Sequence, residues 1–172
     1  MFSIGPDNFD RLLSGAASMD AHFTSAPFQQ NLPMLMAALE IWHRNFNGYP
    51  TQAILPYSYD LRLLPKYLQQ LVMESNGKSV DSHGLPLEQA SSPIVWGEAG
   101  TEGQHSFCQL LHQGTDTVPV DFILPANAGQ SSDHNRLVAH CLAQREAMAR
   151  GESRETLHQL LLSQGCAPAE AL

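Results

Sequence analysis

The sequence predicts an α/β fold in three layers, with a mostly parallel sheet flanked by helices. Three short apolar segments, residues 53–55, 93–96 and 118–124, have the length and composition of buried strands. Stretches with helical spacing separate them, and parallel strands need crossovers of this kind. The chain has 172 residues, 43% of them apolar, which is enough for a hydrophobic core.

Two helices are expected before the first strand, within residues 1–48. Pro6 marks the start of the first helix, because proline is favoured in the first turn. Asn31 can cap the second helix, which Gly48 ends. Apolar residues of the second helix cover so much of its circumference that we expect it to be buried.

The helix after the first strand leads to the first candidate site residue. Residues 61–72 have a helical pattern that Pro65 breaks or restarts. The sequence MESNGK at residues 73–78 is expected to leave this helix for a polar loop, and residues 81–92 to form an exposed connection. Glu74 would then be partly desolvated on one side, a setting that suits a general base. The alternative is a solvated glutamate at a helix end.

A histidine after the second strand is the second candidate. Gly100 and Gly103 are expected to form a tight turn, followed by a helix over residues 104–113 that Gly114 stops. His105 would lie near the N-terminus of that helix, where free N–H groups favour negative charge and keep an imidazole neutral. The alternative is a histidine that caps the helix. His112 lies seven residues further on, whereas zinc-binding pairs usually sit one turn apart, so no metal site is expected.

Further helices are expected after the third strand. Ser132 can cap a helix that runs to Arg150, and Ser153 can cap another that ends at Gly165. Residues 166–170 have the pattern of a new helix start. Both ends of the sequence have the character of cuts from a longer protein.

Charge and cysteine content exclude several classes of function. The formal net charge is −8, and the nine Lys and Arg residues form no block, so a nucleic-acid or anionic-membrane surface is not expected. A local cluster of donors could still hold a small anion. Cys108, Cys141 and Cys166 form no closely spaced pair, and we expect each to be a small buried apolar residue. Neither a signal peptide nor a membrane helix is apparent, which favours a cytoplasmic protein.

Several motifs resemble the glucose-6-phosphate isomerase family. They extend over nearly the whole chain, in order, and include MESNGK (73–78), PIVWGE (93–98), GTEGQHSF (100–107), QLLHQGT (109–115) and PVDFI (119–123). The resemblance implies interconversion of glucose 6-phosphate and fructose 6-phosphate through a cis-enediol, a step of glycolysis and gluconeogenesis, without cofactor or metal.

The resemblance also implies roles for three residues. Glu74 falls on the family's catalytic base, and His105 falls on a histidine that assists ring opening and reaches the neighbouring subunit's site in a homodimer. Gln70 falls on a glutamine that contacts the substrate. Because residues four apart share a helix face, Gln70 can orient the substrate that Glu74 deprotonates.

The resemblance implies a partial subunit. Residues 1–48 correspond to helices that lead from a first sugar-isomerase (SIS) domain, and residues 49–172 to part of the second. The family's phosphate loop, its arginine segment and a late lysine have no counterpart here, so we expect the isolated chain to be inactive. The alternative function is a non-catalytic sugar-phosphate-binding or regulatory module of the same fold. A binding module would need the phosphate-binding groups but no catalytic base. This chain has the residue that matches the base and lacks the phosphate-binding groups, which favours the enzyme.

Overall fold

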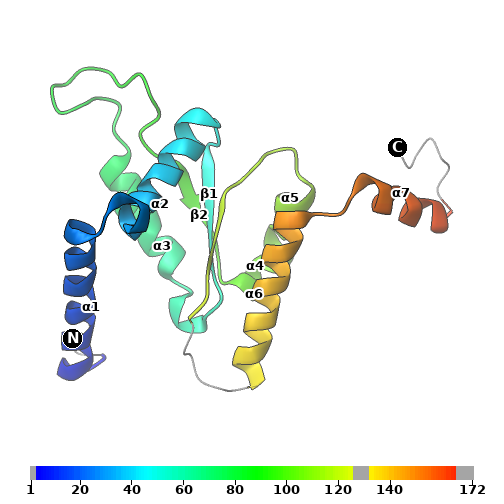
Figure 1. Ribbon diagram of the computed structural model, residues 1–172, viewed down its shortest axis with the longest axis horizontal. Coiled ribbons are helices and arrows are strands. Elements are labelled where there is room, and N and C mark those ends of the chain that lie inside the picture. Colours follow the sequence, from blue (N-terminus) through cyan, green and yellow to red (C-terminus); the bar gives the residue numbers. More distant parts are fainter. Residues whose placement is uncertain (1–2, 126–131, 166–172) are drawn as a thin grey trace. The chain divides into compact units, whose positions relative to one another are not determined.

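The computed structural model describes residues 3–125 and 132–165, which fall into two compact units (Figure 1). Unit 1 is Met1–Gly48 and unit 2 is Tyr49–Leu172.

Unit 1 is helical. Helix α1 (Pro6–Ser25) starts at a proline, as the sequence predicts, and is followed by a short turn η1 (Phe28–Gln30), helix α2 (Leu32–Ile41) and a π-helical turn η2 (Trp42–Phe46).

Asn31 joins the two long helices of unit 1. Its side chain is fully buried, and its Oδ1 accepts from the backbone N–H of Met34 at 3.2 Å, which confirms the predicted cap. Its Nδ2 donates to the carbonyl oxygen of Phe23 at 2.7 Å. His22 adds a second link, because its Nε2 accepts from the N–H of Leu32 at 3.2 Å. The end of α1 and the start of α2 are therefore held by the same pair of side chains.

The expected burial of the second helix is wrong for this chain. Leu39, Trp42 and Phe46 are 57%, 54% and 71% exposed. In the described part of unit 1, α1, η1 and the η2 turn that continues the helix pack on α2, and they leave much of a helix that is apolar on most of its circumference uncovered. Trp42 and Phe46 instead stack on each other, with ring centroids 5.2 Å apart.

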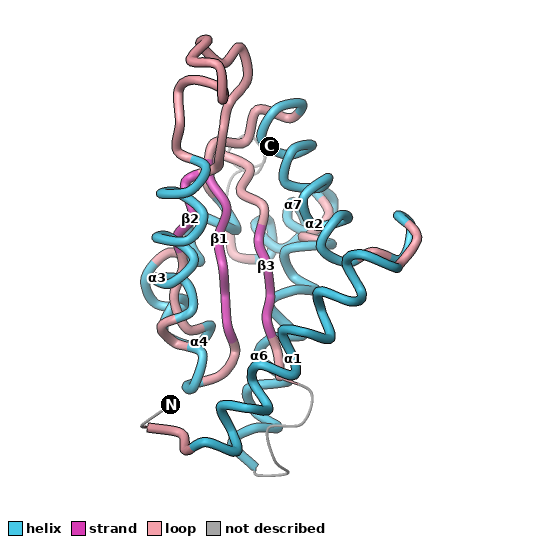
Figure 2. Tube along the Cα trace, turned by 90° about the vertical axis from the view of Figure 1, so that its left-hand side faces the viewer, coloured by secondary structure: helices cyan, strands magenta, loops and turns pink. Residues whose placement is uncertain are grey.

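The centre of unit 2 is a parallel sheet, which confirms the predicted α/β class. Its strands are β1 (Thr51–Pro56), β2 (Ile94–Trp96) and β3 (Val120–Ile123), in the order β2-β1-β3 (Figure 2). Ala53 pairs with Trp96 on one side and with Val120 on the other. Because β1 is central, Ala53 and Leu55 are completely buried. Burying one leucine side chain of this kind contributes about 1.5–3 kcal/mol.

Helices cover both faces of this sheet (Figure 1). On one side lie a short turn η3 (Tyr59–Leu61), α3 (Leu64–Leu68) and a π-helical segment η4 (Gln69–Glu74). On the other side lie α4 (Gly100–Ser106), α5 (Cys108–Gln113) and α6 (Ser132–Arg150). The core on this second side is built from strand and helix residues: Leu55, Tyr57 and Cys141, with Phe107, Leu111, Val120, Phe122 and Leu124 packed against them.

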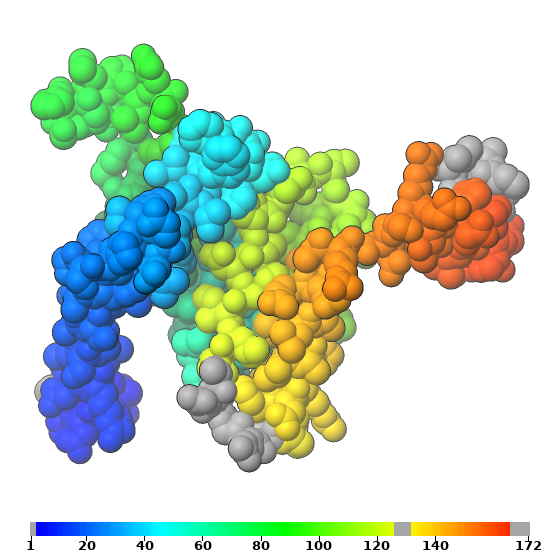
Figure 3. Space-filling model, viewed as in Figure 1, coloured from blue at the N-terminus to red at the C-terminus, as the bar shows by residue number. Residues whose placement is uncertain are grey.

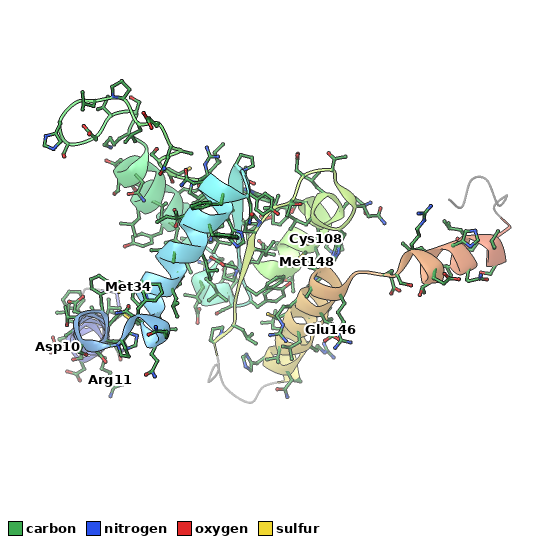
Figure 4. The ribbon with its side chains drawn as sticks, turned by 45° about the horizontal axis from the view of Figure 1, so that its top comes forward. Asp10, Arg11, Met34, Cys108, Glu146 and Met148 are labelled. Carbon is green, nitrogen blue, oxygen red and sulfur yellow. The ribbon has the colours of Figure 1, made fainter. Side chains whose placement is uncertain are left out.

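Two further predictions for unit 2 are confirmed. Ser153 caps α7 (Arg154–Ser163) by accepting from the N–H of Thr156 at 3.0 Å, as predicted. Cys108 and Cys141 are buried, also as predicted. Glu146 lies on the outer side of α6 (Figure 4), and its carboxylate pairs with Arg150 at 3.1 Å. Cys166 and the expected helix start at 166–170 lie outside the described residues.

The connection between η4 and β2 is exposed, as the sequence predicts. Residues 81–92 extend away from the sheet (Figure 3). Asp81 organises the loop, since its Oδ1 accepts from the N–H groups of His83 and Leu85 at 2.8 and 3.0 Å. Over the described part of the chain, no helix combines the length and the apolar character that crossing a membrane requires.

Candidate functional site

Glu74 and Gln70 line the same open hollow on η4. The hollow has a volume of about 490 Å³, and its wall is formed by Tyr67, Gln70, Leu71, Glu74, Ser75 and Lys78. The helical spacing predicted that Gln70 and Glu74 share a face, and they do. A π-helical turn closes i→i+5 hydrogen bonds and still leaves residues four apart on one side. The hollow combines a carboxylate, an amide, a hydroxyl and an ammonium group.

The predicted surroundings of Glu74 need correction. The sequence predicts a loop from residue 73, but the helical winding continues through Asn76. The widened η4 turn is tied to the sheet, because the sulfur of Met73 accepts from the N–H of Val95 in β2 at 3.4 Å. Glu74 is exposed rather than partly desolvated.

Gly77 and Lys78 form a close turn where this helix ends. The N–H of Gly77 donates to the carbonyl oxygen of Met73 at 2.8 Å, and a Cβ at Gly77 would collide with that oxygen. Lys78 then turns back, and its Nζ donates to the carbonyl oxygen of Glu74 at 2.6 Å. A lysine that binds a carbonyl at a helix end is a common cap. Lys78 thereby fixes the backbone of Glu74 and places a positive charge in the hollow.

His105 lies elsewhere than predicted. Helix α4 starts at Gly100, so the glycines form its first turn, and His105 is in its last turn, exposed. The argument from a helix N-terminus therefore does not apply. Glycine is required at both positions because an aromatic ring packs closely on the helix there. A Cβ at Gly100 would overlap the ring of Tyr57, and a Cβ at Gly103 would lie 2.7 Å from the ring of Phe107.

Phe107 separates His105 from His112. Its backbone φ is −135°, which ends α4, and α5 starts at the next residue. The two histidines therefore lie on different helices rather than two turns apart on one helix. His112 has its own partner, with its Nε2 2.8 Å from Oε1 of Gln144 in α6. Across the described residues, His, Cys, Asp and Glu side chains form no group of three or more that could hold a metal ion.

The structure does not bring His105 to Glu74. His105 is absent from the wall of the hollow, and α4 and η4 cover different sides of the sheet. Beside His105, the hydroxyl of Ser106 donates to Oε2 of Glu98 at 2.9 Å. This bond holds the end of α4 to the segment that follows β2.

Tyr57 is a functional candidate that the sequence pattern did not reveal. It follows β1 and is 1% exposed. Burial raises its pKa to about 12; the nearby thiols of Cys141 and Cys108 add to the rise, and the side chain of Gln104 opposes it. Burial also raises the pKa of the Cys108 and Cys141 thiols. In the sequence Tyr57 is an ordinary aromatic beside a strand, and only its fit under Gly100 distinguishes it.

Comparison with known proteins establishes the family. Residues 1–169 match the family model described as phosphoglucose isomerase. The chain belongs to the phosphoglucose isomerase family. A glucose-6-phosphate isomerase of Ruegeria sp. (strain TM1040) is 49% identical over 168 residues, and that of Xanthobacter autotrophicus (strain Py2) is 52% identical over 168 residues. Each comparison covers 96% of this chain and 31% of the relative. The chain thus spans about a third of the length of the curated relatives it matches.

Two solved structures resemble this chain in fold, and one of them is a glucose-6-phosphate isomerase. A glucose-6-phosphate isomerase from Chlamydia trachomatis superposes with a TM-score of 0.71 at 47% identity, over 78% of this chain and 28% of that one. A hypothetical protein from Thermus thermophilus superposes with a TM-score of 0.65 at 26% identity, over 81% of this chain and 36% of that one. The family predicted from the motifs and the α/β architecture predicted from the alternation of strands and helices are both confirmed.

Proposed function

We propose that this chain supplies the proton-transfer part of an isomerase that interconverts glucose 6-phosphate and fructose 6-phosphate. The observation that carries the proposal is the hollow in which Glu74 and Gln70 lie together, in a chain of the phosphoglucose isomerase family. Motif resemblance adds the assignment of Glu74 as base. The motif resemblance implies a reaction without cofactor or metal, and the isomerisation leaves the overall oxidation level of the sugar unchanged.

The proposed step uses Glu74 as a general base. Its carboxylate removes the proton from C2 of the open-chain aldose, and the electrons of that bond form the C1–C2 double bond. The π electrons of the C1=O bond move to O1, which takes a proton from water. The cis-enediol then gives its O2 proton to water as the C2=O bond forms, and the electrons of the C1–C2 double bond take the proton of Glu74 at C1, which gives the ketose. Gln70 donates a hydrogen bond to a sugar hydroxyl and holds the reacting carbons beside Glu74.

His105 is proposed to assist ring opening in the active site of a second subunit of a homodimer. Its exposure supports this role, as does its absence from the wall of the Glu74 hollow. A solvent-facing histidine on a different layer of the same chain is available to a neighbouring molecule. Histidine suits the task because its ordinary pKa is close to neutral pH.

The domain assignment is also a proposal. Residues 1–48 would lead from a first SIS domain, and residues 49–172 would form part of the second. The curated relatives are about three times as long as the matched segment, which leaves room for the groups that bind phosphate and stabilise the enediolate. Such electrostatic groups often contribute more to catalysis than any other effect, so the isolated chain should turn over little substrate. A cytoplasmic location would follow from the sugar-phosphate substrates.

A chimera tests the proposed function. In it, this segment replaces the matching segment of the Ruegeria isomerase, and a coupled assay measures fructose 6-phosphate formation. Glu74→Gln should lower kcat by a factor of about 10²–10⁴, the usual contribution of a positioned base. KM should change little, because the amide is isosteric. Glu88→Gln is the matched control, since Glu88 lies in the exposed loop and outside the hollow.

The same variants separate the enzyme from the alternative, a non-catalytic sugar-phosphate-binding module. An inactive chimera would reject the proposal, and so would equal turnover of Glu74→Gln and Glu88→Gln. For the module, the isolated chain should bind fructose 6-phosphate tightly in a titration, and Glu74→Gln should leave that affinity unchanged.

A further inference from the structure

The hydroxyl of Tyr57 lies at the junction of three helices. The backbone N–H of Tyr57 donates to the carbonyl oxygen of Ile123 at 2.8 Å, so the sheet fixes this residue. Its ring stacks on Phe122 of β3, with centroids 6.2 Å apart, and belongs to the buried core. Around the hydroxyl lie Gln104 of α4, Cys108 of α5 and Cys141 of α6. The phenol hydroxyl of Tyr57 therefore lies within an otherwise apolar core.

Two buried polar atoms at this junction lack a hydrogen-bond partner within the described ranges. They are the hydroxyl oxygen of Tyr57 and Nε2 of Gln104. Buried polar groups are nearly always paired, so such an orphan pair calls for an explanation. The two atoms are complementary, because the amide donates and the phenol oxygen accepts. The Gln104 side chain also faces the hydroxyl, since it favours the ionised form of Tyr57.

We infer that Tyr57 is a positioning residue for His105. Its hydroxyl pairs with the side-chain amide of Gln104 and thereby fixes the rotation of α4 about its own axis. A small turn of the Gln104 side chain closes this bond and satisfies both orphan atoms. Gln104 directly precedes His105, so the two side chains leave the helix about 100° apart. Holding one of them therefore sets the direction of the other.

The ring and the hydroxyl of Tyr57 have separate tasks. The ring fixes how close α4 approaches the sheet, because a Cβ at Gly100 would overlap it. Contact with a bare glycine leaves the helix free to rotate, since there is no side chain to interlock. Gln104 lies four residues after Gly100 and so on the same face. The bond from Ser106 to Glu98 ties the end of α4, and the hydroxyl–amide bond adds a rotational constraint on the face that meets Tyr57.

Tyr57→Phe isolates the second task, because it keeps the ring and removes only the hydroxyl. Tyr59→Phe is the matched control: Tyr59 is two residues away and 68% exposed, and its ring contacts Arg62. The measurement is a long-range proton–nitrogen NMR spectrum of the histidine rings in the 172-residue chain. His112 serves as an internal reference, since it is held by Gln144 on a neighbouring helix.

We expect Tyr57→Phe to shift the ring signals of His105 and to leave those of His112 in place, while Tyr59→Phe shifts neither. Gln104→Met should shift His105 as Tyr57→Phe does, and the double variant should add nothing further. The inference fails if His105 does not move in Tyr57→Phe, if His112 moves equally, or if the two single effects add. It also fails if both single variants unfold while Tyr59→Phe folds, because the pair would then hold the whole core rather than α4.

This inference rests on the proposed function only for its catalytic consequence. The histidine signals are read without substrate, so an inactive chimera would reject the isomerase proposal and leave the position of His105 open to this test. In an active chimera, Tyr57→Phe should lower kcat while leaving KM nearly unchanged, because substrate binding in the Glu74 hollow does not involve α4. Equal kcat values for Tyr57→Phe and Tyr59→Phe would contradict the positioning role.

Discussion

At the scale of single residues, chemistry and packing depend on a few close fits. Lys78 caps the carbonyl of Glu74, and Gly77 is needed for the turn that allows it. Gly100 lets the ring of Tyr57 lie against α4. The sequence predicted Glu74, Gln70 and His105 as site residues through their motifs. It could not predict Tyr57, because a fit between residues far apart in the chain leaves no local pattern.

Gly100→Ala tests the contact between α4 and Tyr57. The added methyl group would overlap the ring, and overpacking of this kind costs about 1–3 kcal/mol. Gly15→Ala is the control, because Gly15 lies inside α1 with open space around its Cα, and alanine there should be neutral or stabilising by about 0.5–1 kcal/mol. Urea unfolding measures both. Equal stabilities for the two variants would show that α4 does not rest on the Tyr57 ring.

The raised pKa of Tyr57 predicts a loss of stability in alkali. The folded protein holds the phenol proton up to a pKa of about 12, whereas the unfolded chain releases it near 10. The unfolded state therefore gains from ionisation first, and stability falls as the pH rises from about 10 to about 12. The loss attributable to Tyr57 is on the order of 2–3 kcal/mol. The difference between the unfolding free energies at about pH 9 and about pH 11.5 should be smaller in Tyr57→Phe than in the wild type. An equal difference in the two proteins would show that Tyr57 does not cause the loss of stability.

At the scale of elements, the predicted strands and the helices at 6, 132 and 154 are present, because apolar patterns, proline and cap residues mark them locally. Two helix boundaries, the end of the helix that carries Glu74 and the start of the helix that carries His105, were wrong. The helix before Glu74 continues through Asn76 because a π-helical turn and the Met73 contact with β2 extend it. Helix α4 starts at Gly100 because aromatic rings require glycine there, whereas paired glycines usually indicate a turn. In both cases tertiary contacts override the local signal.

Asn31→Ala tests how unit 1 holds its helices together. The change removes the cap on the N–H of Met34 and the donor to the carbonyl of Phe23, so it should destabilise the α1–α2 junction by about 2 kcal/mol or more. Asn8→Ala removes one exposed bond, to the carbonyl of Ile4, and should have little effect. Amide hydrogen exchange in α2 distinguishes them: faster exchange only in Asn31→Ala is expected, and unchanged protection would show that Asn31 does not join the helices.

At the scale of the whole molecule, the residues proposed for the reaction lie in two separate places on the chain. Glu74 and Gln70 form one wall of a hollow, whereas His105 faces solvent on another layer. The apolar side chains of α2 that are exposed are not covered by the other described elements of unit 1. The sequence predicted the family and the α/β sheet, because motif spelling and strand patterns are local. It predicted the burial of α2 wrongly, because burial depends on what packs on the helix.

The isolated chain should have little or no isomerase activity. Its hollow holds a base, an amide and one ammonium group, while the proposed reaction also needs groups that bind phosphate and stabilise the enediolate. A coupled assay with glucose 6-phosphate should find turnover at least about 10³-fold below that of the chimera. Comparable turnover in the two proteins would show that this segment is catalytically complete.

The proposed proton transfer by Glu74 between C2 and C1 can be followed by isotope exchange. The chimera converts glucose 6-phosphate in deuterium oxide, and mass spectrometry measures deuterium at C1 of the fructose 6-phosphate formed. We expect incorporation with the wild-type segment and with Glu88→Gln, because an exposed carboxylate exchanges its proton with solvent between removal and return. Glu74→Gln should abolish incorporation while fructose 6-phosphate still binds. Deuterium at C1 in Glu74→Gln at the rate of Glu88→Gln would show that Glu74 is not the base.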